Sequence, residues 1–85
     1  MKMSISAPPR PRNVRIHGRR TSMRLEAPFW TALEEIAATL EMPIETLCER
    51  IADSAHRGNL SSAIRVFVLA WSRKQARKQL RIRVN

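Results

Sequence analysis

Apolar and polar positions recur at two different spacings along this 85-residue chain. Between residues 13 and 26 the two kinds alternate. One parity carries the less polar side chains, Thr21, Met23 and Leu25. The other parity carries Arg20, Ser22 and Arg24. Strict alternation is typical of a strand with one buried face, so the pattern predicts one short strand here.

The rest of the chain has helical spacing. Over residues 28–41 and 43–55 the apolar residues recur every three or four positions, which places them along one side of each helix. Residues 60–75 are apolar around nearly the whole circumference, so we expect this third helix to be buried across an interface between two copies.

The predicted strand has no partner strand in a chain that otherwise looks helical. A lone strand of this length is not stable, and the simplest partner is the same strand of a second copy. A domain this small also buries a limited share of its surface, which favours an oligomer. The expected fold is therefore mainly α with one short strand, in the order β-α-α-α. It would pair its strand with that of a second copy.

Composition sets the expected boundaries of the folded domain. Residues 1–12 hold three of the five prolines and few side chains that could pack, so they predict a disordered basic N-terminal arm. Residues 13–75 form the predicted domain, and residues 76–85 a basic C-terminal tail. We find no apolar run long enough to span a membrane and no secretory signal, and we expect a cytoplasmic, nucleoid-associated protein.

Charge indicates the kind of partner. Sixteen Lys and Arg against seven Asp and Glu give a net charge of +9, and all seven acids lie between Glu26 and Asp53. The two ends of the chain are thus purely basic, as suits a protein that grips a polyanion. One cysteine, Cys48, and two histidines, His17 and His56, have no metal-ligand spacing. No catalytic constellation is visible, so we expect neither an enzyme nor a bound metal or cofactor.

Two segments carry a family resemblance. HGRRTSMRLEAPFWTALEEIA at 17–37 and GNLSSAIRVFVL at 58–69 resemble the ribbon-helix-helix domains of small bacterial DNA-binding proteins. The resemblance covers residues 17–71. It implies an intertwined homodimer whose intermolecular antiparallel two-stranded ribbon enters the major groove of double-stranded DNA. The function we expect is that of a transcriptional repressor.

The candidate site residues follow from the strand parity and from this resemblance. The polar face of the strand is expected to contact bases, because Arg and Ser suit direct readout of base edges: Arg20, Ser22 and Arg24. Phosphate contacts are expected from the strand and from the start of the last helix, where free N–H groups attract anions: Arg19, Asn59, Ser61 and Ser62. Helix capping is a compatible role for the last three. The expected dimer core is apolar: Met23, Leu25, Phe29, Ile64, Phe67, Val68 and Trp71.

Several alternatives stay open. The shortest proteins of this kind have two helices, so 43–55 is either an insertion, which the NLSSA segment favours, or the usual second helix. The chain could instead be the DNA-binding partner of a toxin, with the basic tail holding a protein. It could also be a basic adaptor for RNA or a membrane surface. A helix-turn-helix is disfavoured because the third helix has almost no polar face.

Overall fold

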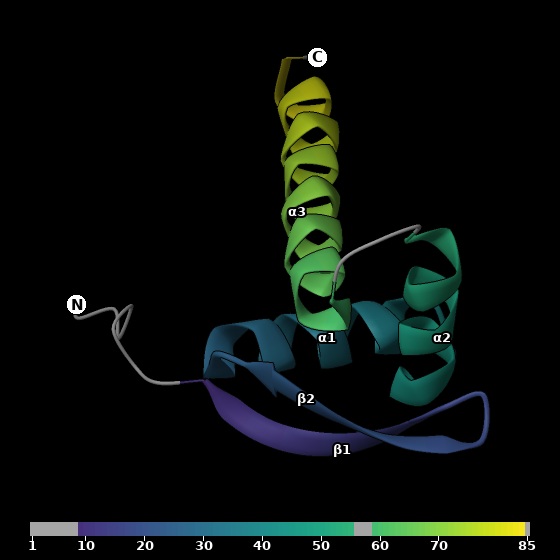
Figure 1. Ribbon diagram of the computed structural model, residues 1–85. Helices are drawn as coiled ribbons and strands as arrows, with labels where there is room; N and C mark the ends of the chain where they lie inside the picture. The colour runs from purple at the N-terminus through teal and green to yellow at the C-terminus, as the bar shows by residue number, and fades with distance from the viewer. Residues whose placement is uncertain (1–8, 56–58, 85) are drawn as a thin grey trace.

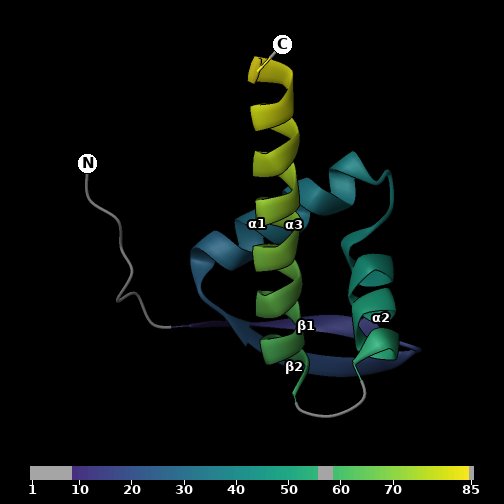
Figure 2. The same cartoon turned by 90° about the horizontal axis from the view of Figure 1, so that it is seen from above.

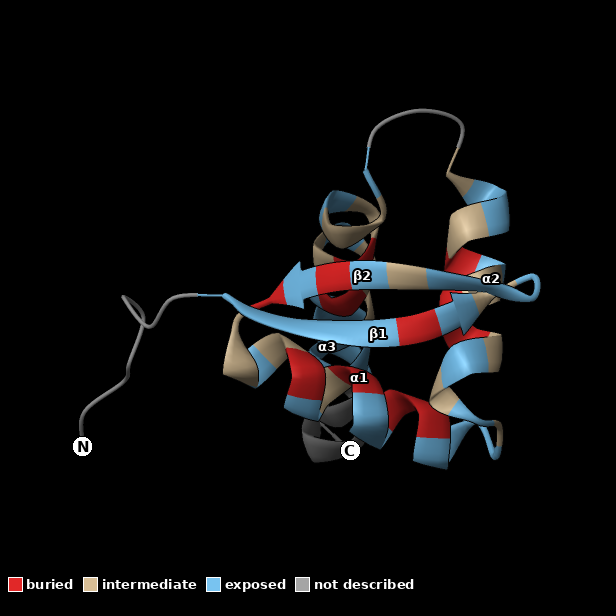
Figure 3. Ribbon diagram, turned by 60° about the horizontal axis from the view of Figure 1, so that its bottom comes forward, coloured by how far each residue is buried: buried red, intermediate tan, exposed pale blue. Residues whose placement is uncertain are grey.

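In the computed structural model of the chain, residues 9–55 and 59–84 are described, with side chains of the last helix described as far as Lys78. Two strands precede three helices: β1 (Arg10–Ile16), β2 (Arg19–Leu25), α1 (Ala27–Thr39), α2 (Ile44–Ser54) and α3 (Leu60–Val84). The strands form a hairpin, and all three helices lie on one side of it (Figure 1). The opposite face of the hairpin is left without a covering element among the described residues (Figure 3).

The hairpin corrects the expectation of one unpartnered strand. β1 pairs with β2 antiparallel in a register that runs from Arg10 opposite Leu25 to Ile16 opposite Arg19. The two residues between the strands, His17 and Gly18, have φ values of 52° and 81°. Positive φ at both central residues is the requirement of the two-residue turn that matches strand twist, and Gly and His are among the residues that tolerate it. The order is therefore β-β-α-α-α, and β2 has its first partner within its own chain.

β1 begins inside the stretch that was expected to be a disordered arm. Residues 10–12 pair with β2, and Pro11 is accommodated because β1 is an edge strand, where a missing N–H costs no ladder bond. Trp30 of α1 also anchors this end, since its indole Nε1–H donates to the carbonyl oxygen of Arg10 at 3.1 Å. Residues 1–8 of the expected arm lie outside the described residues.

The two shorter helices lie close to their expected bounds. Pro28 stands in the first turn of α1, where a missing N–H is harmless. α1 ends near Glu41, whose φ of 57° turns the chain toward Pro43, the N-cap residue of α2. The middle of each predicted helix stripe is buried, but Leu40 at the end of the first is 39% exposed and Trp30, outside that stripe, is buried.

One core joins the hairpin to the helices. Its buried side chains come from every element: Val14, Met23, Leu25, Trp30, Leu33, Ile36, Ala37, Leu47, Cys48, Ile51, Ile64 and Val68. No polar side chain of the described residues is buried. The inner face of the hairpin is thus fixed by apolar packing, which holds its outer face in a defined orientation.

α3 is longer than expected and less buried. It continues to Val84, through most of the stretch 76–85 that was expected to be a basic tail beyond the domain. Its first half packs on the core, but Val66 is 67% exposed and Leu69 59% exposed, so the helix is not buried on all sides within one chain. Figures 1 and 2 show it rising away from the hairpin and ending clear of the other helices.

Candidate nucleic-acid interface

The outer face of the hairpin carries the alternate residues of both strands that point away from the helices. On β2 the three predicted base-contact residues, Arg20, Ser22 and Arg24, are all exposed, and their inward neighbours Met23 and Leu25 are 2% and 0% exposed. The strand parity expected from the sequence is therefore the observed one. Contact between these side chains and DNA stays a prediction.

β1 adds residues that the sequence reasoning missed. In the register, Asn13 lies opposite Ser22 and Arg15 lies opposite Arg20, so both share the outer face. The signal is present in the sequence. Val14 and Ile16 alternate with Asn13 and Arg15, and a two-residue turn at His17–Gly18 turns one strand into two.

The outer face concentrates positive charge that nothing in the described chain neutralises. Arg15 and Arg20 stand directly opposite each other, an arrangement that destabilises a hairpin when both residues carry the same charge. Every Asp and Glu side chain lies within the described residues, and none of them forms an ion pair with Arg15, Arg20 or Arg24. An anion placed against this face would relieve the repulsion.

Arginines on the inner parity are placed differently. The Arg12 side chain reaches over the Trp30 ring, with its guanidinium carbon 4.7 Å from the ring centroid, and its Nη2 lies 3.0 Å from Glu34 Oε2. Arg19, expected to contact phosphate, shares this inner parity at the turn end of β2 and is exposed there. The inner parity thus ties the hairpin to α1 at one end and leaves a charge free at the other.

The turn of the hairpin is tied to α2. The backbone N–H of His17 donates to Glu49 Oε2 at 2.9 Å, and its ring Nε2 lies 2.8 Å from Asp53 Oδ1. Hydrogen bonding to Asp53 and the negative charges of Asp53 and Glu49 raise the pKa of His17 above its usual value. The contact is therefore strongest when His17 is protonated. These two acids orient the loop end of the outer face.

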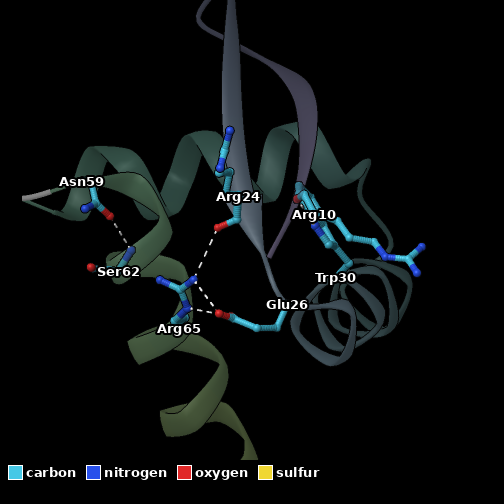
Figure 4. A network of polar contacts seen from close by, with 7 residues as sticks. All are labelled: Arg10, Arg24, Glu26, Trp30, Asn59, Ser62 and Arg65. Atoms are coloured by element: carbon cyan, nitrogen blue, oxygen red, sulfur yellow. Dashed lines mark hydrogen bonds and ion pairs between the residues drawn. The ribbon is translucent and has the colours of Figure 1, made fainter. Parts of the chain in front are cut away.

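The start of α3 lies against the other end of the hairpin (Figure 4). Asn59 Oδ1 accepts the N–H of Ser62 at 2.8 Å, so Asn59 caps the helix. Arg65 holds Glu26 with two contacts, Nε–Oε1 at 3.0 Å and Nη2–Oε2 at 3.1 Å. Arg65 Nη2 also lies 3.5 Å from the carbonyl oxygen of Arg24, which fixes α3 beside the strand.

Glu26 and Arg65 form an ion pair, the Arg65–Glu26 joint, where the hairpin meets α3. Neither residue was singled out from the sequence. The guanidinium of Arg65 lowers the pKa of Glu26 below its usual range. The side chains are 27% and 33% exposed, and the Arg65 guanidinium carbon lies 5.9 Å from the centroid of the Phe29 ring. The pair joins β2, α1 and α3, and its residues stand within the two motifs quoted from the sequence, at LE and at SSAIR.

The residues expected to form a dimer core divide into two sets. Met23, Leu25, Ile64 and Val68 are at most 6% exposed and complete the core of a single chain. The other three are partly buried at its edge: Phe29, Phe67 and Trp71. The phenyl ring of Phe67 lies 6.2 Å from the Trp71 ring, centroid to centroid. With the exposed Val66 and Leu69, these partly buried rings leave apolar surface on α3.

No metal site is found among the described residues, and their one thiol is unreactive in its setting. They contain no group of three or more His, Cys, Asp or Glu side chains placed to hold a metal ion. Burial raises the pKa of the Cys48 thiol to about 11, so it stays protonated at neutral pH and is a poor nucleophile. None of the described helices could cross a membrane.

These features define a class of small domain in which a basic two-stranded hairpin packs on helices and leaves its outer face free to bind a ligand. The family model of the ribbon-helix-helix domain matches residues 9–72, three quarters of the chain, and the chain belongs to this family. The domain is generally a non-enzymatic fold of DNA-binding regulators. The chain is also similar to a solved structure, that of an uncharacterized protein from Bordetella pertussis Tohama I, at 39% identity and a TM-score of 0.72. The match covers 82% of this chain but 60% of that protein. No curated protein matches the chain.

Proposed function

We propose that this protein binds double-stranded DNA sequence-specifically through the outer face of its hairpin and acts as a transcriptional repressor. The observation that carries the proposal is the row of unpaired arginines on a rigid two-stranded ribbon. Arg forms two parallel hydrogen bonds with guanine O6 and N7, and Ser and Asn reach donors or acceptors on the other bases. Arg15, Arg20 and Arg24 with Asn13 and Ser22 supply these groups.

The ribbon of this proposal comes from one chain. The major groove is about 12 Å wide and admits a two-stranded β-ribbon, so one hairpin fills one groove segment. An intermolecular ribbon is then unnecessary for reading bases. Phosphates beside the groove meet Arg19 and the start of α3, where free N–H groups and the Asn59 amide nitrogen can donate.

The protein acts as a homodimer in this proposal, with α3 as the contact. Val66 and Leu69 are the two most exposed large apolar side chains of the described residues. Both side chains line a shallow hollow of about 390 Å³, together with Phe29, Val68 and Ser72. In this proposal the hollow receives apolar side chains of the second copy. A dimer places two hairpins on the DNA and excludes other proteins from both groove segments, which is the physical basis for repression.

The test is to select DNA fragments from a random pool with the purified protein and to sequence them. We expect a short near-palindrome with guanines at equivalent positions of the two halves, since each hairpin presents the same arginines. Enrichment of no sequence, with equal affinity for selected and random DNA, would overturn specific binding. Enrichment of a single, non-repeated element would support sequence-specific binding by the hairpin and would contradict the homodimer.

A further inference from the structure

α3 carries a second basic surface that the proposed reader does not use. Arg73, Lys74, Arg77 and Lys78 are all exposed, and their spacing of i, i+1, i+4 and i+5 places them on one side of the helix. We call these four residues the tail patch. No Asp or Glu follows Asp53 in the chain, and none of the described carboxylates pairs with the tail patch. Like charges four residues apart on a helix repel, so an anionic partner would stabilise this segment.

The tail patch points away from the hairpin. α3 meets the hairpin at Arg65, which contacts the Arg24 carbonyl (Figure 4). It then extends away from the hairpin on the side opposite the outer face (Figure 1). At 1.5 Å per residue, Arg73 is about 12 Å along the helix from Arg65, and Lys78 about 20 Å. The tail patch and the outer face therefore lie at opposite ends of the molecule.

A duplex read by the hairpin cannot also reach the tail patch of the same chain. The major groove is about 8.5 Å deep, so its walls come level with the ribbon and the base of the helices. The tail patch begins beyond that depth and on the far side of the core. Its charges have to meet a different anion.

We propose that the tail patch binds the phosphate backbone of a second DNA duplex, so that the protein bridges two duplexes. The inference rests on the proposed function, because it takes the hairpin as the site of the first duplex. Duplex DNA fits the patch by charge: it carries one negative charge per about 1.7 Å of axis, and a row of Lys and Arg on one helix face follows such a line of charge. Acidic protein is the competing partner, and the experiment separates the two.

The experiment uses a duplex of the selected sequence fixed to beads and a second, fluorescent duplex of mixed sequence in solution. The full chain should capture the fluorescent duplex, and capture should fall on the order of 100-fold between 50 and 200 mM salt if all four side chains contact phosphate. The variant R73Q/K74Q/R77Q/K78Q should lose at least tenfold in capture while still binding the fixed duplex. R73K/R77K keeps the charges and should capture as the wild type does. Circular dichroism would establish that both variants keep the helix.

The outcomes distinguish the two proposals. Full capture by the four-glutamine variant overturns the bridge and leaves the hairpin reader intact, since paired hairpins would then hold both duplexes. Loss of capture of the fluorescent duplex in R15A/R20A/R24A, with retained binding of the fixed duplex through the tail patch, supports the division of roles. If polyglutamate at equal charge displaces the fluorescent duplex more strongly than free duplex does, the tail patch is a site for acidic protein and the bridge is wrong.

Discussion

The two faces of the hairpin carry arginines in different electrostatic settings. On the inner parity, Arg12 lies over an aromatic ring and against a carboxylate, whereas Arg10 and Arg19 form no ion pair with an Asp or Glu of the described residues. On the outer parity, Arg15, Arg20 and Arg24 have no carboxylate partner among the acids of the chain. A chain with seven acids and sixteen bases cannot neutralise every arginine. The comparison teaches which ones serve the fold and which remain for a ligand.

The largest effect is expected from the loss of a buried apolar side chain on the inner face of the hairpin. Leu25 is fully buried where β2 meets α1 and α3, so Leu25→Ala should cost about 2–5 kcal/mol of stability. Chemical denaturation followed by circular dichroism measures the loss. Because the outer face depends on this packing, DNA binding should weaken at the same temperature at which the fold melts. A variant as stable as the wild type would show that the core does not set the hairpin.

A smaller effect is expected from Arg12→Ala, which compares an inner-face arginine with those of the outer face. Arg12→Ala removes an exposed ion pair and a cation–π contact, together worth about 1 kcal/mol. Its preference for selected over random DNA should be unchanged, since Arg12 does not share the outer face. Denaturation and binding titrations on the same preparation give both quantities. A clear loss of discrimination would place Arg12 among the DNA-reading residues.

The contact between the hairpin turn and α2 should respond to pH. The folded pKa of His17 is raised, so the contact stabilises the fold fully below the unfolded pKa of about 6.5 and is lost as pH rises through the higher folded value. Asp53→Asn should lower the His17 pKa, measured from its ring resonances by NMR, and should reduce the pH dependence of stability. Glu35→Gln of α1, an acid that forms no ion pair among the described residues, is the matched control. Equal His17 titration in wild type and Asp53→Asn would rule out the pairing.

The smallest expected signal is the reactivity of Cys48. Its thiol is fully buried and its pKa is raised to about 11, so a thiol reagent at neutral pH should label it only when the domain opens. Native protein should react far more slowly than protein in denaturant. Fast native labelling would mean that α2 separates readily from the core.

Much of this architecture could be predicted because the buried positions repeat regularly. The parity of β2 depends on spacing alone and appears as expected, and so does the buried centre of each helix stripe, although Leu40 at one stripe's end is exposed. β1 was missed because three prolines suggest disorder, and because Gly18 interrupts the alternation without a residue pattern that predicts a turn. The Arg65–Glu26 joint was also missed, since it links residues 39 positions apart and no local pattern predicts which charges meet.

The central claim is that the unpaired arginines of the outer face read DNA bases. Binding titrations of Arg20→Ala and Arg24→Ala on selected and scrambled DNA at several salt concentrations test it most directly, with Arg50→Ala of α2 as a control of equal charge change. Each variant should stay folded and lose about 2–6 kcal/mol of discrimination if both copies in a dimer contact bases, at about 1–3 kcal/mol per contact. The control should keep the wild-type preference. Folded variants that bind selected DNA with unchanged affinity, specificity and salt slope would contradict the account.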